Sequence, residues 1–168
     1  MNDKLAAVRG AHEALRFLND AYRTRLVRPG RTTEHPITVG RLLADDGQSP
    51  RLVIAGLLHD ALEDTGAKPG ELCEKFGGEI TRLVAALTED RSISQYRARK
   101  AALRGQILDA GPDAATISLA DKLAKLQGVT SRPKKRKLEH YRLTLNEVEQ
   151  RYGPSRLSVL LRAQLYRW

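Results

Sequence analysis

The segment AGLLHDALEDTG, residues 55–66, ends an apolar run in a cluster of ionisable side chains. Charged groups behind a buried segment lose hydration, and a divalent metal ion is a partner that can compensate an imidazole and several carboxylates together. In a helix, His59 and Glu63 lie one turn apart, as do Asp60 and Asp64. The segment therefore predicts that one imidazole and three carboxylates gather beside a stripe of core residues.

Apolar residues recur at three- and four-residue steps along almost the whole chain, and convincing alternating stretches are absent, so the sequence predicts an all-α fold. Glycine and proline mark the ends of the expected helices. The predicted helices span residues 4–22, 36–45, 50–63, 69–76, 78–88, 93–109, 113–126, 134–151 and 154–166. Since 41% of the 168 residues are hydrophobic, we expect a single domain over residues 1–168 with its own core.

No stretch of the sequence approaches the roughly 18 consecutive apolar residues of a membrane span. The amino-terminal segment is too interrupted by charge for a signal peptide. We therefore expect a cytoplasmic protein without a membrane partner. The single cysteine, Cys73, has no internal disulfide partner, which agrees with a reducing compartment, and we expect a buried structural thiol there.

The net charge of +9, from 29 Lys and Arg against 20 Asp and Glu, predicts an anionic partner such as a phosphorylated metabolite or nucleic acid. The densest basic run is residues 131–142. A solvated surface is its first interpretation, a phosphate-attracting rim the second and nucleic-acid binding the third. Only Tyr141 interleaves with the run, so base stacking has little support and nucleic acid is not the expected partner. The sequence predicts no oligomeric state.

A mixed set of His and Asp donors suits manganese, iron or zinc better than calcium, which prefers oxygen ligands. Because an adjacent His-Asp pair rarely completes a metal shell, two further candidates matter: His35 in TEHP, and Asp121 in SLADKL. Each also has an ordinary structural interpretation. His35 is alternatively a loop residue or helix cap, and Asp121 a solvated helix residue paired with Lys122 or Lys125. The order of the motifs along the chain favours the metal site.

Four ordered motifs, EHPITVGRLL, AGLLHDALEDT, FGGEITRLVAALTEDRSISQYRARK and ISLADKLAKL, resemble those of the HD-domain metal-dependent phosphohydrolases. They are most similar to the hydrolase domain of the RelA/SpoT stringent-response enzymes and to the small alarmone hydrolases, over about residues 12–150. The resemblance implies an HD-domain helical bundle. It also implies a hydrolase that removes the 3′-pyrophosphate from guanosine tetra- or pentaphosphate (ppGpp) or a related nucleotide.

The same resemblance implies roles for particular residues. The implied metal ligands are His35, His59, Asp60 and Asp121. Manganese is the metal usual for alarmone hydrolases, and it is the expected cofactor. Glu63 and Asp64 would form the acid/base pair that positions and deprotonates the attacking water.

The chain differs from the family at positions where the family binds its substrate. Lys125 stands where the family usually has Asn, and the basic loop at residues 23–31 aligns too poorly for any of its arginines to be assigned. Arg99 and Lys100 match a basic pair of the small alarmone hydrolases and, with Lys125, are the expected substrate-binding residues. Two alternatives stay open: an HD-superfamily phosphatase for another nucleotide or phosphorylated metabolite, and a non-catalytic module that binds alarmone or nucleic acid. The intact acid/base pair argues against the second.

Overall fold

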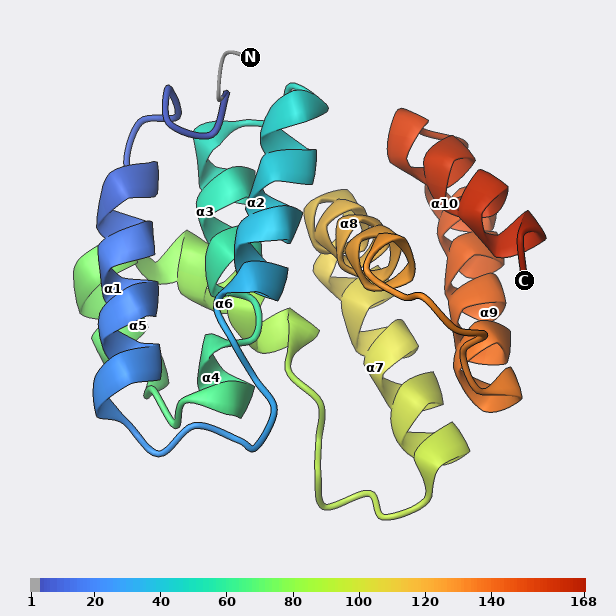
Figure 1. Ribbon diagram of the computed structural model, residues 1–168, viewed down its shortest axis with the longest axis horizontal. Coiled ribbons are helices and arrows are strands. Elements are labelled where there is room, and N and C mark those ends of the chain that lie inside the picture. The colour runs from blue at the N-terminus through green and yellow to red at the C-terminus, as the bar shows by residue number, and fades with distance from the viewer. Residues whose placement is uncertain (1–3) are drawn as a thin grey trace. The chain divides into compact units, whose positions relative to one another are not determined.

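The computed structural model describes residues 4–168, and all regular secondary structure within that range is helical (Figure 1). This confirms the all-α prediction. The helices are α1 (Ala11–Thr24), α2 (Glu34–Asp45), α3 (Pro50–Leu58), α4 (Ala61–Asp64), α5 (Pro69–Phe76), α6 (Gly78–Leu87), α7 (Tyr96–Ala110), α8 (Pro112–Gln127), α9 (Lys135–Tyr152) and α10 (Arg156–Tyr166). The chain divides into two compact units, the first ending at Thr88 and the second running from Glu89 to Trp168. The expected single domain stays a prediction.

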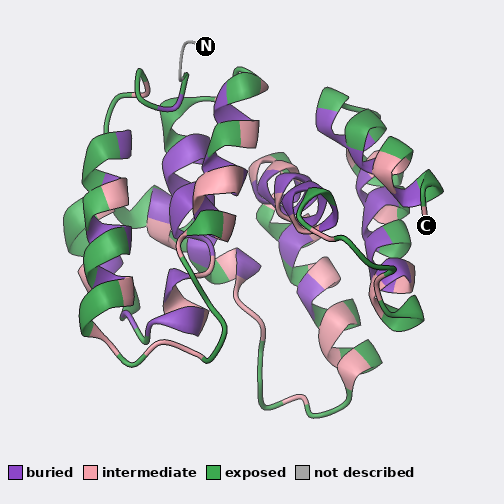
Figure 2. Cartoon of the chain, in the orientation of Figure 1, coloured by how far each residue is buried: buried purple, intermediate pink, exposed green. Residues whose placement is uncertain are grey.

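Helix α3 is the centre of the first unit, where it packs against α1, α2 and α6. It is buried from Leu52 to Leu58, as Figure 2 shows. Two glycines let α2 and α3 approach closely. A Cβ atom at Gly56 would lie 2.3 Å from Cδ1 of Leu43, and one at Gly40 would lie 2.5 Å from Cδ2 of Leu57. Because α2 and α3 form a tight hairpin, the start of α2 lies beside the end of α3.

Helix α8 is the most buried helix of the second unit and packs against α7, α9 and α10. Its core side chains include Ile117, Leu119 and Leu123, all almost fully enclosed. At the start of α10, the side chain of Ser155 accepts a hydrogen bond from the backbone N–H of Ser158 in a capping box. This unit therefore has a core of its own.

Two predicted helices differ from the structure. Helix α1 begins at Ala11 instead of residue 4, because Gly10 has a φ of 85°, a left-handed conformation that ends any helix before it. The predicted helix 50–63 is broken at His59 and Asp60 into α3 and α4. All other predicted helix ends lie within three residues of the observed ones.

The expectation that Cys73 is buried is wrong. Its thiol-bearing side chain is exposed on α5, whereas the preceding Leu72 is fully enclosed. The amphipathic pattern of α5 explains the difference. Leu72 lies on the apolar face of the helix, and Cys73, the next residue, lies on the face toward solvent.

Among residues 4–168, no helix combines the length and the apolar character that crossing a membrane requires.

Candidate functional site

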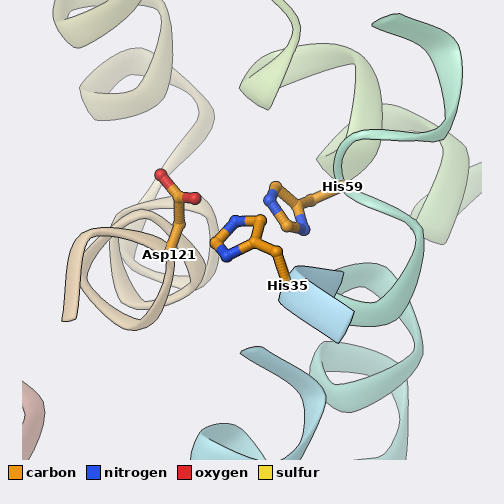
Figure 3. Close-up of side chains that lie close together, drawn as sticks. All are labelled: His35, His59 and Asp121. Carbon is orange, nitrogen blue, oxygen red and sulfur yellow. The ribbon is translucent and has the colours of Figure 1, made fainter. Parts of the chain in front are cut away.

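The hairpin of α2 and α3 brings two histidines of the first unit together. His35 is the second residue of α2, and His59 follows the last residue of α3. Their ring centroids lie 5.2 Å apart at an interplanar angle of 76°, and Figure 3 shows the two imidazoles side by side. The close approach at Gly40 and Gly56 is what makes this pairing possible.

The orientation of His59 is fixed by a backbone contact. Its Nδ1 lies 2.7 Å from the carbonyl oxygen of Gly56, and the side chain is 3% exposed. Because a carbonyl can only accept, Nδ1 carries the proton, and in the neutral ring the lone pair is then on Nε2. A histidine held in this way through its other ring nitrogen is the usual arrangement of a metal ligand.

Both imidazoles direct Nε2 at the same carboxylate oxygen. Oδ2 of Asp60 lies 3.3 Å from Nε2 of His59 and 3.8 Å from Nε2 of His35. A divalent ion bonded at about 2.1 Å to each donor separates neighbouring donors by about 3.0 to 3.4 Å. The distance from His59 falls in that range and the distance from His35 lies just above it, so this mixed nitrogen and oxygen donor set suits manganese, iron or zinc.

The two carboxylates that follow have different surroundings. Glu63 receives one contact from Arg28, whose Nη1 lies 3.4 Å from its Oε2. Asp64 is far more enclosed: it accepts hydrogen bonds from Nη1 of Arg28 at 3.1 Å and from the hydroxyl of Tyr22 at 3.2 Å, and Nε of Arg31 lies 3.5 Å away. The carboxylate of Asp64 is thus heavily engaged within the protein, while that of Glu63 is more accessible.

Burial raises the pKa of Asp64 above its ordinary value, and the negative charge of Asp60 raises it further. The cations of Arg31 and Arg28 and the Tyr22 hydroxyl act in the opposite direction. The backbone N–H of Arg28 also donates to the carbonyl oxygen of Asp64 at 3.0 Å. These contacts tie the loop between α1 and α2 to α4.

Sequence reasoning missed Tyr22, Arg28 and Arg31 as components of this region. The four arginines of residues 23–31 were visible as a basic loop. The signal that could have separated them is charge: a buried aspartate needs cationic partners, and the loop is the nearest basic segment before the His-Pro pair.

Asp121 lies on α8 of the second unit, between two lysines. Its Oδ1 is 2.6 Å from Nζ of Lys125, one turn further on, and its Oδ2 is 3.8 Å from Nζ of Lys122. Lys122 is buried and donates to Oγ of Ser118 at 2.7 Å. Burial lowers the pKa of Lys122 to about 8. The structure thus realises the ordinary pairing of Asp121 with lysines.

The basic pair at the start of α7 contacts an acidic residue of its own unit. Nε of Arg99 donates to Glu89 at 2.8 Å, and Nζ of Lys100 contacts the same carboxylate. Arg99 also donates to the carbonyl oxygens of Ile93 and Ser94 at 2.7 and 3.0 Å. Arg99 therefore holds the loop before α7 in place, and its expected phosphate contact stays a prediction.

Comparison with known sequences assigns the chain to a family. A family model described as HD domain matches residues 14–146. The human guanosine-3′,5′-bis(diphosphate) 3′-pyrophosphohydrolase MESH1 is 34% identical over 95 residues, which are 55% of this chain and 52% of MESH1. A probable GTP pyrophosphokinase of Mycobacterium leprae is 32% identical over 117 residues, 68% of this chain and 15% of that protein. The chain thus spans about half of MESH1 and a small part of the pyrophosphokinase.

Solved structures agree on the fold. The structure described as a metazoan ortholog of SpoT that hydrolyzes ppGpp has a TM-score of 0.74 at 23% identity, covering 99% of this chain and 96% of that one. Lmo0812 from Listeria monocytogenes has a TM-score of 0.69 at 24% identity, covering 84% and 97%. These likenesses concern the fold alone. Together with the family model over residues 14–146, they confirm the predicted HD-domain fold, and the chain belongs to the HD domain family.

Proposed function

We propose that this protein is a metal-dependent phosphohydrolase that removes the 3′-pyrophosphate from guanosine tetra- or pentaphosphate or a related nucleotide. One observation carries the proposal: two imidazole nitrogens lie close to one oxygen of Asp60, and Glu63 lies three residues further on, within α4. The substrate class is taken from the relatives named as guanosine-3′,5′-bis(diphosphate) 3′-pyrophosphohydrolases, which match about half of this chain at 34 to 35% identity.

The proposed metal ligands combine nitrogen and oxygen donors. They are His35 and His59, Asp60, whose Oδ2 lies nearest to both imidazoles, and Asp121, which Figure 3 draws on its helix. Manganese is the proposed ion, since it accepts both imidazole and carboxylate donors. When bound, a divalent ion of this kind supplies Lewis-acid chemistry, polarising a phosphoryl oxygen and making water more acidic.

The proposed acid/base chemistry divides Glu63 from Asp64. Glu63, the less buried of the two, accepts the proton of the attacking water. Asp64 positions Arg28 and Arg31, whose charges it binds from a buried location. For guanosine tetraphosphate, a bond forms between the water oxygen and phosphorus while the bond to the ribose 3′ oxygen breaks. The 3′ oxygen keeps the electron pair and takes up a proton, which gives GDP and pyrophosphate.

The proposed substrate contacts are cationic. Lys100 and Lys125 are the side chains offered to the substrate phosphates, with Arg99 holding the loop before α7. Lys125 also supports a second candidate. Because a charged ammonium replaces the amide that the family usually has there, the substrate could be another nucleotide or phosphorylated metabolite with more charge at that point.

The test is turnover of a defined panel by the purified chain with Mn²⁺. Guanosine tetraphosphate, GTP, GDP and other phosphorylated nucleotides are offered separately, and phosphate and pyrophosphate are quantified. Stoichiometric pyrophosphate and GDP from guanosine tetraphosphate support the main proposal, whereas turnover of a different compound selects the second candidate. The comparison variant is Asp60→Asn, which removes the charge of one proposed metal ligand and should abolish turnover. No hydrolysis of any compound by protein that binds Mn²⁺ would refute both.

A further inference from the structure

Helices α9 and α10 of the second unit lie side by side (Figure 1), and a pocket of about 280 Å³ opens between them. Its volume lies at the lower end of the range for small-molecule sites, which is about 300 to 1,000 Å³. None of its lining residues belongs to the proposed hydrolase site. The pocket is therefore a separate candidate for a small ligand.

The pocket has apolar and aromatic walls. Leu145 of α9 and Leu165 of α10 line it with almost fully enclosed side chains. Two aromatic residues complete the wall: Tyr166, which is 82% exposed, and Trp168, which follows the end of α10. Aromatic side chains pack favourably against another ring, edge-on or offset, so these walls suit a ligand with a ring.

The polar groups of the pocket are hydrogen-bond donors, and one of its two arginines carries an uncompensated charge. Arg162 contacts the carboxylate of Glu149. Arg142 forms no salt bridge within residues 4–168, and its Nη2 donates to the neutral carbonyl oxygen of Leu165 at 3.3 Å. Asn146, one turn after Arg142 on α9, has a side-chain amide without a hydrogen-bond partner in the described part of the chain.

The indole of Trp168 is a further donor. Its Nε1 is enclosed and has no acceptor among the residues that the structure describes. A buried N–H without an acceptor costs free energy, so the ring gains from any acceptor that comes within its reach. An anion bound at Arg142 supplies one nearby, because Nη2 of Arg142 and the backbone N–H of Trp168 both donate to the carbonyl oxygen of Leu165.

We propose that this pocket binds a small aromatic carboxylate. The guanidinium of Arg142 and the amide of Asn146 hold the carboxylate, and the ring packs against Leu145 and Tyr166. A single negative charge matches the uncompensated charge of Arg142, whereas a phosphate monoester carries about −1.5 to −2 at pH 7. The sequence also favours an anion here, since residues 151–168 contain four arginines and no acidic residue.

The first experiment titrates the full chain with phenylacetate. Trp168 is the only tryptophan of the sequence, so its fluorescence reports on the pocket directly. We expect a saturable change with phenylacetate. Phenylacetamide, its neutral isostere, should bind at least about tenfold more weakly, because the charge-assisted contact is lost. Acetate, which has the charge without the ring, should also bind at least about tenfold more weakly.

The second experiment repeats the titration with variants. Arg142→Gln should raise the Kd for phenylacetate at least about tenfold. The matched control is Arg151→Gln, which removes the same charge from α9 at an exposed position outside the pocket. It should leave the Kd within about twofold of the wild-type value, since an exposed charge is screened. Tyr166→Ala, at an exposed position, should weaken binding about three- to tenfold.

A nuclear magnetic resonance titration of the ¹⁵N-labelled chain gives an independent readout. The indole N–H of Trp168 and the side-chain amide of Asn146 should both shift as phenylacetate saturates the pocket. Neither should shift with phenylacetamide at the same concentration.

The outcomes decide the inference. Tighter binding of phenylacetate than of its amide, lost in Arg142→Gln and kept in Arg151→Gln, supports it. Equal binding of the two compounds, or equal binding by wild type and Arg142→Gln, overturns it, as does the absence of any saturable response to phenylacetate. If urea denaturation shows that Arg142→Gln does not fold, the comparison of the two compounds on wild type and on Tyr166→Ala decides instead.

Discussion

The hydroxyl of Tyr22 donates a hydrogen bond of 3.2 Å to Oδ2 of Asp64, which lies 42 residues further along the chain. Burial raises the pKa of Tyr22 well above its ordinary value, and the negative charges of Asp64 and Asp60 raise it further. The phenol therefore stays protonated and remains a donor. The contact joins the last turn of α1 to α4, the helix that carries the proposed proton acceptor Glu63.

We expect Tyr22→Phe to lower the free energy of unfolding by about 1 to 2 kcal/mol, because it removes a hydrogen bond to a buried carboxylate. Urea denaturation measures the change. The control is a double-mutant cycle in which Tyr22→Phe is repeated in an Asp64→Asn background, where its cost should be smaller. Equal costs in the two backgrounds would show that the hydroxyl does not act through Asp64.

Glu63 and Asp64 should respond differently to isosteric neutral substitutions. Glu63→Gln should lower kcat about 10²- to 10⁴-fold and leave the Kd for Mn²⁺ unchanged, because it removes a proton acceptor and no proposed ligand. Asp64→Asn should also lower stability, since Arg28 and Arg31 lose a charged partner. Steady-state kinetics and urea denaturation of both variants test this division. A wild-type kcat in Glu63→Gln would contradict the assigned role.

Local spacing in the sequence predicted the helical pattern and the grouping of four ionisable side chains after α3. The break at His59 and Asp60 was not predicted, because apolar residues continue at helical spacing through both positions. Hydrophobic periodicity indicates which side chains face the core. It does not indicate a local change in backbone angle such as the ψ near zero at Asp60. The Asp60 to Asp64 relation survives the break, since the N–H of Asp64 still donates to the carbonyl oxygen of Asp60 at 2.8 Å.

The partners of the site residues were harder to predict than the residues themselves. Arg28 meets Asp64 across 36 positions of the chain, and a loop of that kind has no periodicity from which its course can be derived. The sequence allowed two interpretations of Asp121, a metal ligand or a helix residue paired with a lysine. The i,i+4 spacing favours the observed pair with Lys125. Sequence patterns therefore identified the candidate residues, whereas their long-range ion pairs required the structure.

The close packing of α2 on α3 should control the geometry of the two histidines. Gly56→Ala would place a Cβ atom 2.3 Å from Cδ1 of Leu43, so α2 must shift, at a cost of about 1 to 3 kcal/mol in stability. Because α2 carries His35 and α3 ends beside His59, the shift should also weaken Mn²⁺ binding. Thermal denaturation and calorimetric titration measure the two effects.

Gly105→Ala is the matched control for that substitution. Gly105 lies within α7, and a Cβ atom there would meet nothing within 4 Å. Alanine should therefore stabilise the protein by about 0.5 to 1 kcal/mol through its better helix propensity. If Gly56→Ala is as well tolerated as Gly105→Ala, the packing of the hairpin does not set the histidine geometry.

Metal removal should lower thermal stability. At a Mn²⁺ concentration of 100 times Kd, binding to the folded state adds about 2.7 kcal/mol, which for a chain of this length raises Tm by about 5 to 10 °C. Differential scanning fluorimetry with Mn²⁺ and after EDTA treatment measures the shift. Asp60→Asn should abolish it, whereas His12→Gln, at an exposed position outside the proposed ligand set, should retain it. A full shift in Asp60→Asn would remove Asp60 from the ligands.

Buried His140 should make the stability of the protein fall in acid. Burial, and the nearby cations of Lys122, Lys100 and Arg104, lower its pKa from 6.5 to about 2. Below pH 6.5 the unfolded chain therefore binds a proton that the folded chain does not bind. The free energy of unfolding is highest above pH 6.5 and declines as the pH falls. At pH 5 the loss from this residue is about 2 kcal/mol. His140→Gln should reduce the difference in unfolding free energy between pH 7.5 and pH 5 by that amount in urea denaturation, and an unchanged difference would show that another group causes the acid sensitivity.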